Sequence, residues 1–291
     1  MRSAGTGGGR TGRSAPGEAR IVPLKPGEPG PCVFLVPGTG GRVEGFAALG
    51  RLLRTPMPVY AIEARGVDDT SDPDSDAEVM IAHYLERIRS LQPSGPYFLA
   101  GHSFGGMVVH ELAQRLLSDN EDVGCLILFD TVTPRKYWPL SFHAANLGSR
   151  LRGHVARLLT TPPGKSLSYY LRRFHLRIHG LHQIPSDLKF GNDAARMLLA
   201  NEMLFKKWSP QFYPGRLILF CCADTKNLPS LWRNRVRELE VHLSAGSHLN
   251  LIEPPHVSSL AEAMSRCLAR APHPHPGPPA GRRRGLTAGG G

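Results

Sequence analysis

The stretch that decides the fold is residues 97–106, which read YFLAGHSFGG. Its first half is a short apolar run of strand length, and residues 107–117 after it have the apolar spacing of a helix. Between the two stands Gly101-His102-Ser103-Phe104-Gly105, which fits the G-x-S-x-G pattern of a nucleophile elbow. The small residues let the chain turn sharply and lift the Ser103 hydroxyl above the edge of a sheet. This context predicts that Ser103 is a catalytic nucleophile.

Outward from this stretch, short apolar runs alternate with helical patterns, which indicates βαβ units and a mostly parallel sheet flanked by helices. We expect strands at residues 33–36, 59–62, 97–100, 125–129, 217–220 and 239–243, and helices at 78–91, 107–117 and 256–269. The sequence therefore predicts one α/β core, divided between residues 31–131 and 211–270.

Residues 132–210 interrupt this alternation with helix-like stretches at 143–160, 166–179 and 193–208. The segment holds thirteen Lys and Arg residues against three acidic ones, so it carries most of the net charge of +11. We expect it to form an inserted helical lid.

The two ends of the sequence, residues 1–30 and 271–291, are rich in Gly, Pro and Arg and lack hydrophobic periodicity. We expect a flexible N-terminal linker and a flexible tail. Neither end resembles a secretory signal, and no apolar run approaches the roughly 20 residues that span a bilayer. The sequence therefore predicts a cytoplasmic protein without membrane contact.

The basic charge and the five cysteines exclude further classes of function. The charge lies in one internal segment and two tails and accompanies no DNA-binding motif, so we expect no nucleic-acid partner. Cys32, Cys125, Cys221 and Cys222 lie in or beside apolar strand-like runs, as free structural thiols do. No Cys/His spacing matches a zinc pattern, so we expect neither a metal nor a bound cofactor.

The remaining members of a catalytic triad are sought at the carboxyl ends of the other strands. His248 follows the last predicted strand, where a loop can bring a general base to Ser103. Two acids compete to orient it, since Asp130 ends the strand after Ser103 and Asp224 ends the strand after the insertion. We favour Asp130, because its strand is expected to neighbour that of Ser103 and its spacing of 27 residues fits one helix and one strand.

The oxyanion hole requires two backbone N–H groups aimed at the developing negative charge. We assign one to Phe104, the residue after the nucleophile. The other belongs to the turn after residues 33–36, where we choose Thr39 over Gly38.

These residues together resemble the type I thioesterase domains of nonribosomal peptide and polyketide synthetases, over roughly residues 20–270. The matching segments are IVPLKPG at 21–27, which is similar to the linker that follows a carrier protein, FLVPGTGG at 34–41, GPYFLAGHSFGG at 95–106, YPG at 213–215 and GSH at 246–248. The resemblance implies an α/β-hydrolase core, a lid over the active site and a Ser–His–Asp triad, and Asp130 stands where these domains carry their acid. It also implies a small-molecule acyl chain, delivered on the phosphopantetheine arm of an acyl or peptidyl carrier protein.

We therefore expect a serine thioesterase that releases an acyl, peptidyl or polyketide chain by hydrolysis or macrocyclisation. Such domains normally end a giant chain, whereas this sequence begins at Met1 without a carrier domain. A discrete editing thioesterase of type II, which acts in trans, is therefore an alternative. A carboxylesterase or lipase would use the same triad, and a non-catalytic binding module is the remaining option. The sequence leaves open the acyl chain, the choice between hydrolysis and cyclisation, and the oligomeric state.

Overall fold

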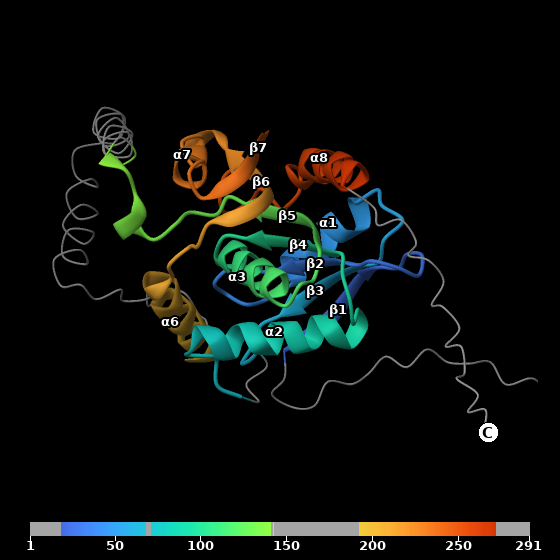
Figure 1. Ribbon diagram of the computed structural model, residues 1–291, viewed down its shortest axis with the longest axis horizontal. Coiled ribbons are helices and arrows are strands. Elements are labelled where there is room, and N and C mark those ends of the chain that lie inside the picture. The colour runs from blue at the N-terminus through green and yellow to red at the C-terminus, as the bar shows by residue number, and fades with distance from the viewer. Residues whose placement is uncertain (1–18, 68–70, 141, 143–191, 272–291) are drawn as a thin grey trace, which may run out of the picture.

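The fold is described from a computed structural model, in which residues 19–67, 71–140, 142 and 192–271 are the described part of the chain. Its centre is a seven-stranded sheet with the strand order β1-β3-β2-β4-β5-β6-β7 (Figure 1). The strands are β1 (Arg20–Lys25), β2 (Val33–Val36), β3 (Val59–Glu63), β4 (Tyr97–His102), β5 (Val123–Phe129), β6 (Tyr213–Cys222) and β7 (Val236–Ser244). Only β1 is antiparallel to its neighbour among these strands. The prediction of a mostly parallel α/β sheet is confirmed.

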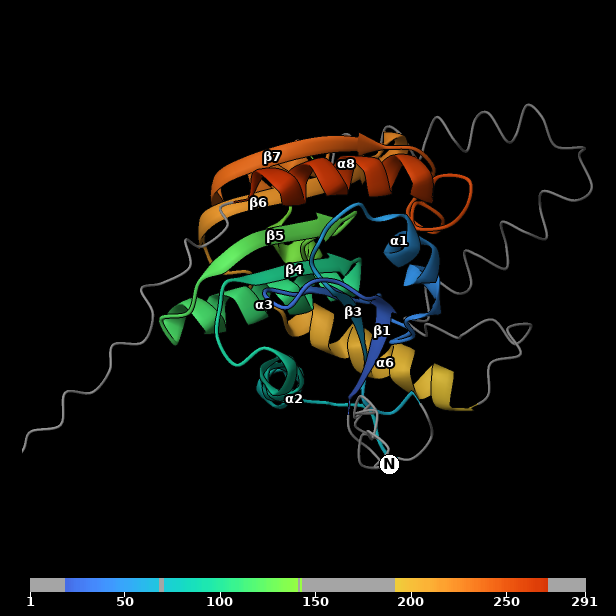
Figure 2. The same cartoon turned by 90° about the vertical axis from the view of Figure 1, so that its right-hand side faces the viewer.

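Helices cover both faces of the sheet (Figures 1 and 2). One face carries α2 (Ala77–Leu91), α3 (Phe104–Ser118) and α6 (Asn192–Lys207), and the other carries α1 (Ala47–Leu52) and α8 (Val257–Arg270). The shorter turns of helix are η1 (Glu44–Phe46), η2 (Arg135–Tyr137), η3 (Ala223–Thr225) and α7 (Pro229–Trp232).

Two hydrophobic cores result, one on each side of the sheet, and the strands contribute to both by alternation. In β2, Phe34 and Val36 pack with the α2 and α3 side, whereas Val33 and Leu35 pack with the α1 and α8 side. All four side chains are buried. A strand that is buried on both faces reads as a continuous apolar run, which is why these strands stand out in the sequence.

The predicted strands and helices of the core agree with the structure to within a few residues, but the N-terminal segment differs. The sequence analysis placed residues 1–30 in a flexible linker, whereas residues 20–25 form β1 and pair with β3. Leu24 of this strand packs against the backbone of Gly50 in α1, where an added Cβ would meet its side chain. Pro23 and the partial exposure of its residues hide β1 from a search for buried apolar runs, because proline and exposed side chains are tolerated on an edge strand.

Part of the predicted lid is described and part is not. The predicted helix at 193–208 corresponds to α6, whereas those at 143–160 and 166–179 lie outside the described residues, as do residues 1–18 and 272–291. Leu204 and Trp208, at the end of α6, belong to the core on the α3 side. The domain limits 31–131, 132–210 and 211–270 therefore stay a prediction.

Two further observations bear on the expectations from composition. Within the described residues, none of the helices combines the length and the apolar character needed to cross a bilayer. All five cysteines, Cys32, Cys125, Cys221, Cys222 and Cys267, are buried free thiols.

Candidate active site

Ser103 lies at the sharp turn between β4 and α3. Its backbone has φ 55° and ψ −115°, a conformation that non-glycine residues rarely adopt, and its amide donates to the Phe129 carbonyl at 2.9 Å. The turn is possible because a Cβ at Gly101 would run into the carbonyl of Gly105, and a Cβ at Gly105 would run into that of Val36. Ser103 therefore sits at the N-terminus of α3, where negative charge is favoured.

Asp130 follows directly after β5, on the strand beside that of Ser103. Its side chain is fully buried, and its Oδ2 lies 2.7 Å from His248 Nδ1. The other oxygen, Oδ1, accepts from the Thr225 hydroxyl and from the Cys222 amide, the latter at 3.2 Å. Both oxygens of the buried carboxylate are thus hydrogen-bonded, as burial of a charge requires.

The charge of Asp130 is decided by two opposing effects. Burial raises the pKa of a carboxyl group, because it removes water from the ionised form. The hydrogen bonds from His248, Thr225 and the Cys222 amide lower the pKa of Asp130 and outweigh the burial, so the net pKa lies below its ordinary value. Asp130 is therefore ionised at neutral pH, and it fixes the proton of a neutral His248 ring on Nδ1.

His248 is presented by the loop between β7 and α8. Gly246 begins the turn with φ 88°, and the Asn250 carboxamide oxygen accepts from the Ser247 amide at 2.7 Å and from its hydroxyl at 3.1 Å. The imidazole is 36% exposed, so it is reachable from solvent while its Nδ1 faces Asp130. This leaves Nε2 as the atom that can accept a proton.

His102, the residue before the nucleophile, fastens this loop to β4. Its Nε2 lies 2.9 Å from the backbone carbonyl of His248, and the centroids of the two rings are 5.2 Å apart. Burial, together with the neighbouring His248, lowers the pKa of His102 to about 4. His102 is therefore neutral at neutral pH and donates its Nε2 proton to the His248 carbonyl.

The side chains of Ser103 and His248 are less closely associated than those of His248 and Asp130. Among the hydrogen bonds of the described residues, none joins the Ser103 hydroxyl to the His248 ring. Such bonds are often long without substrate and tighten only in the reacting complex. The structure thus brings His248 and Asp130 together, with Ser103 at the same sheet edge.

The turn after β2 lies beside the nucleophile. A Cβ at Gly38 would sit 3.5 Å from the Ser103 Cβ, and the next residue, Thr39, is held through its carbonyl by Asn201 of α6 at 2.8 Å. Phe104 opens α3 with its side chain buried, and the first amides of a helix have no intrahelical acceptor. Thr39 and Phe104 therefore lie next to residues at the nucleophile, and their role in the oxyanion hole stays a prediction.

Comparison with known proteins identifies the fold and the family. The family model described as Thioesterase domain matches residues 31–268. The chain belongs to this family. The resemblance to type I thioesterase domains is thereby confirmed, as is the prediction of a hydrolase that acts on thioesters.

The relatives of this thioesterase domain are large synthetases, and each match covers a small part of the synthetase. Malpinin synthetase of Mortierella alpina is 37% identical over 111 residues, which cover 38% of this chain and 1% of the synthetase. Dimodular nonribosomal peptide synthase of Bacillus subtilis (strain 168) is 33% identical over 120 residues, which cover 41% of this chain and 5% of that protein. The chain thus spans only a small fraction of the length of these relatives.

Among solved structures, the NocB thioesterase domain, in covalent complex with a fluorophosphonate nocardicin G analog, shares the fold. It superposes with a TM-score of 0.60 at 23% identity, over 86% of this chain and 99% of that one. The α/β-hydrolase fold of the thioesterase domain is thereby confirmed.

The structure distinguishes between the two acids, Asp130 and Asp224, that the sequence offered as partners of His248. Asp224 lies exposed in η3, whereas Asp130 is in contact with His248. The side chain that reaches the site from η3 is the neighbour of Asp224, Thr225, which donates to Asp130.

Sequence reasoning missed three supporting groups of the thioesterase domain: the Thr225 hydroxyl, the Cys222 amide and the His102 ring. The only sequence signal for Thr225 was its position directly after a strand-end carboxylate. His102 stood inside the motif but carried no pattern of its own.

Proposed function

We propose that this thioesterase domain releases an acyl, peptidyl or polyketide chain from the phosphopantetheine arm of a carrier protein, through an acyl intermediate on Ser103. The observation that carries the proposal is the 2.7 Å contact of His248 with the buried carboxylate of Asp130, beside the elbow that bears Ser103. Membership in the thioesterase family supports the choice of a thioester as the bond that is broken.

In the first step, His248 Nε2 takes the proton of the Ser103 hydroxyl while Oγ attacks the thioester carbonyl. The charge that develops on the carbonyl oxygen is stabilised by the amides of Thr39 and Phe104. When the tetrahedral intermediate collapses, the carbon–sulfur bond breaks and the thiol leaves with the proton from His248. An acyl-serine and a free phosphopantetheine thiol result.

In the second step, His248 deprotonates the incoming nucleophile, which attacks the acyl-serine and restores the Ser103 hydroxyl. Water as the nucleophile gives a free acid, and an amine or hydroxyl of the bound chain gives a macrocycle. Throughout, Asp130 holds the ring orientation and stabilises the imidazolium.

The relatives support a carrier-borne substrate, because each is a synthetase of which this chain matches a small part. A carrier domain in the same polypeptide and a separate carrier protein are both compatible with this proposal. The cytoplasmic location and the absence of a bound cofactor stay predictions from the sequence.

Intact-protein mass spectrometry tests the proposal directly. The full chain is mixed with a series of acyl chains, each presented as a carrier-bound thioester, as a pantetheine thioester and as a simple oxygen ester. We expect a mass increase equal to the acyl group on the wild type and none on Ser103→Ala, with Ser118→Ala, at the end of α3, as the control that is acylated normally.

The products of the same reactions distinguish the alternatives. A free acid indicates hydrolysis, and a product lighter than that acid by one water indicates cyclisation. Preference for pantetheine and carrier thioesters supports the proposal. Acylation of Ser103 only by oxygen esters would overturn it in favour of a carboxylesterase or lipase.

A further inference from the structure

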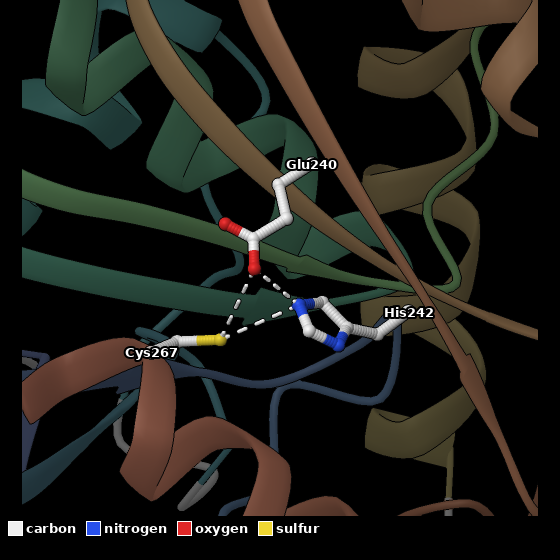
Figure 3. A group of neighbouring side chains, drawn as sticks. All are labelled: Glu240, His242 and Cys267. Carbon is white, nitrogen blue, oxygen red and sulfur yellow. Dashed lines mark hydrogen bonds and ion pairs between the residues drawn. The ribbon is translucent and has the colours of Figure 1, made fainter. Parts of the chain in front are cut away.

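A second cluster of donor atoms lies away from Ser103, between β7 and α8 (Figure 3). Glu240 and His242 are on β7, an edge strand, with their side chains on the same face, and Cys267 projects toward them from α8. Glu240 Oε1 lies 2.6 Å from His242 Nε2, which lies 3.5 Å from Cys267 Sγ, and the sulfur is 4.0 Å from Glu240 Oε1. One carboxylate oxygen, one imidazole nitrogen and one thiol therefore converge on a common point.

The identity and the spacing of these donors fit a zinc-like cation. Thiolate, imidazole and carboxylate are the protein ligands of Zn²⁺, at about 2.3 Å for sulfur and about 2.0–2.2 Å for nitrogen and oxygen. In a tetrahedron, those bond lengths place two ligand atoms roughly 3.3–3.6 Å apart. The separation of sulfur and nitrogen already has this value, and small shifts of the Glu240 side chain bring its two distances into range.

A cation already interacts with the cluster. Arg270 Nη2 lies 2.6 Å from Glu240 Oε1 and 3.6 Å from Cys267 Sγ, so a guanidinium contacts two of the three donors. Arg270 is the last residue of α8 and its side chain is 55% exposed, which allows it to swing into solvent. Arg216 pairs with the other oxygen, Oε2, and would keep orienting the carboxylate after Arg270 has left.

The donors are also held in place. The His242 ring stacks on Phe220 of the neighbouring strand, with centroids 4.9 Å apart and an angle of 19° between the rings. Cys267 is 1% exposed, whereas Glu240 and His242 are partly open to solvent, so an ion approaches from the side that Arg270 now covers. Little reorganisation is therefore needed beyond the movement of Arg270 and a small shift of the Glu240 side chain.

We propose that Glu240, His242 and Cys267 form a binding site for one zinc-like divalent cation, with water as the fourth ligand. On binding, Cys267 releases its thiol proton to solvent, His242 carries its ring proton on Nδ1, and Arg270 leaves as a cation. The sequence analysis expected no metal, because it searched for ligands at close linear spacing. Here Cys267 lies 25 positions after His242 in the chain.

The location of the site gives it a consequence for the enzyme. The loop that carries His248 runs from the end of β7 to the start of α8, and the metal would tie these two elements together. The ion would therefore stabilise the packing of α8 against β7, the two elements that the catalytic loop connects. This inference does not depend on the identity of the acyl substrate.

The test uses the full chain after removal of metal with a chelator, and Zn²⁺ alone as the probe in isothermal titration. We expect one Zn²⁺ per chain and a rise in melting temperature on binding. His242→Ala and Cys267→Ser should each weaken binding by more than the roughly 10–100-fold that loss of an outer-shell partner costs. His256→Ala, in the same loop, and Cys32→Ala are the matched controls and should bind as the wild type does.

Two further measurements keep the test decisive if a variant fails to fold. Arg270→Gln removes the competing guanidinium and should tighten Zn²⁺ binding, an effect opposite to that of losing a ligand. Co²⁺ bound to the wild type should show the near-ultraviolet absorption of a thiolate ligand. Absence of stoichiometric binding, Co²⁺ without a thiolate band, or weaker binding by Arg270→Gln would each overturn the proposal.

Discussion

Two imidazole–carboxylate pairs lie in this structure, and they share a short contact distance but differ in their surroundings. His248 and Asp130 are 2.7 Å apart, and His242 and Glu240 are 2.6 Å apart. Each pair also has a side chain nearby that carries a nucleophilic atom, Ser103 in the first case and Cys267 in the second. The two clusters therefore share the composition of a catalytic triad.

The surroundings of the two carboxylates decide their roles. Besides His248, Asp130 receives hydrogen bonds from a hydroxyl and an amide, which carry no charge, so a protonated His248 is the cation that its contacts favour. Glu240 contacts the guanidinium groups of Arg216 and Arg270, and hydrogen bonds from His242 and both arginines overcome its burial and lower its pKa to about 2. Its charge is already balanced, so proton transfer to His242 gains little.

The accessibility of the two nucleophilic atoms also favours the Ser103 cluster as the catalytic one. Ser103 stands at a strained elbow at the start of α3, half-exposed. Cys267 lies inside α8 with 1% exposure, and burial raises the pKa of its thiol. A short distance between an imidazole and a carboxylate therefore does not make a catalytic triad. A triad also needs an accessible nucleophile and a carboxylate whose charge is not already balanced by other cations.

The largest expected effect is a loss of turnover that distinguishes Ser103 from Cys267. Ser103→Ala should lower thioester turnover by about 10⁶, as in triad knockouts of serine hydrolases, because the acyl-enzyme cannot form. Cys267→Ala should retain turnover within about threefold, since its cluster takes no part in the reaction. Steady-state hydrolysis of a pantetheine thioester measures both. A Ser103→Ala enzyme with near-normal turnover would disprove the serine mechanism.

The next effect tests which carboxylate orients the base. Asp130→Asn should lower the turnover number by about 10⁴, because His248 loses both its tautomer and its counter-charge. Asp224→Asn should change it little, since that side chain is exposed in η3. Both variants are compared at equal thermal stability. A severe loss confined to Asp224→Asn would contradict the assignment.

A smaller effect concerns the hydroxyl that supports Asp130. Thr225→Val removes a hydrogen bond to a charged group, worth about 1.5–3 kcal/mol, so we expect turnover to fall roughly 10–100-fold. Because this bond lowers the pKa of Asp130, its loss raises that pKa, and the acid limb of the pH–rate profile moves to higher pH. Thr225→Ser keeps the hydroxyl and should restore both quantities. An unshifted acid limb in Thr225→Val would show that the hydroxyl does not tune Asp130.

The smallest effect is on stability and concerns His102. Its pKa is lowered from 6.5 to about 4 in the folded protein, so between these pH values the unfolded chain binds a proton that the folded chain does not. Stability should therefore fall as the pH drops from 6.5 toward 4. His102→Gln should flatten this slope in urea unfolding measured across the range, whereas His256→Gln should keep it. An equal slope in the wild type and His102→Gln would refute the shifted pKa.

Much of the fold was predictable because its signals are local. The strands that are buried on both faces read as apolar runs, and α2 and α3 show the periodicity of helices that cover one face of a sheet. The strand β1 escaped notice because it is a partly exposed edge strand with a proline. The predicted positions of Ser103 and His248 followed from the same logic, since residues after parallel strands gather at one sheet edge.

The sequence by itself determined that a serine elbow, a histidine loop and two strand-end carboxylates lie at the carboxyl edge of a parallel sheet, because the periodicity of each strand and the residues that follow it are local features of the sequence. Only the tertiary structure decided that Asp130 contacts His248, that Thr225 supports it, and that Glu240, His242 and Cys267 converge between β7 and α8. These outcomes depend on side-chain directions and on contacts between segments far apart in the chain. Differences of an ångström or two separate a hydrogen bond from a solvated carboxylate, and no linear spacing encodes them.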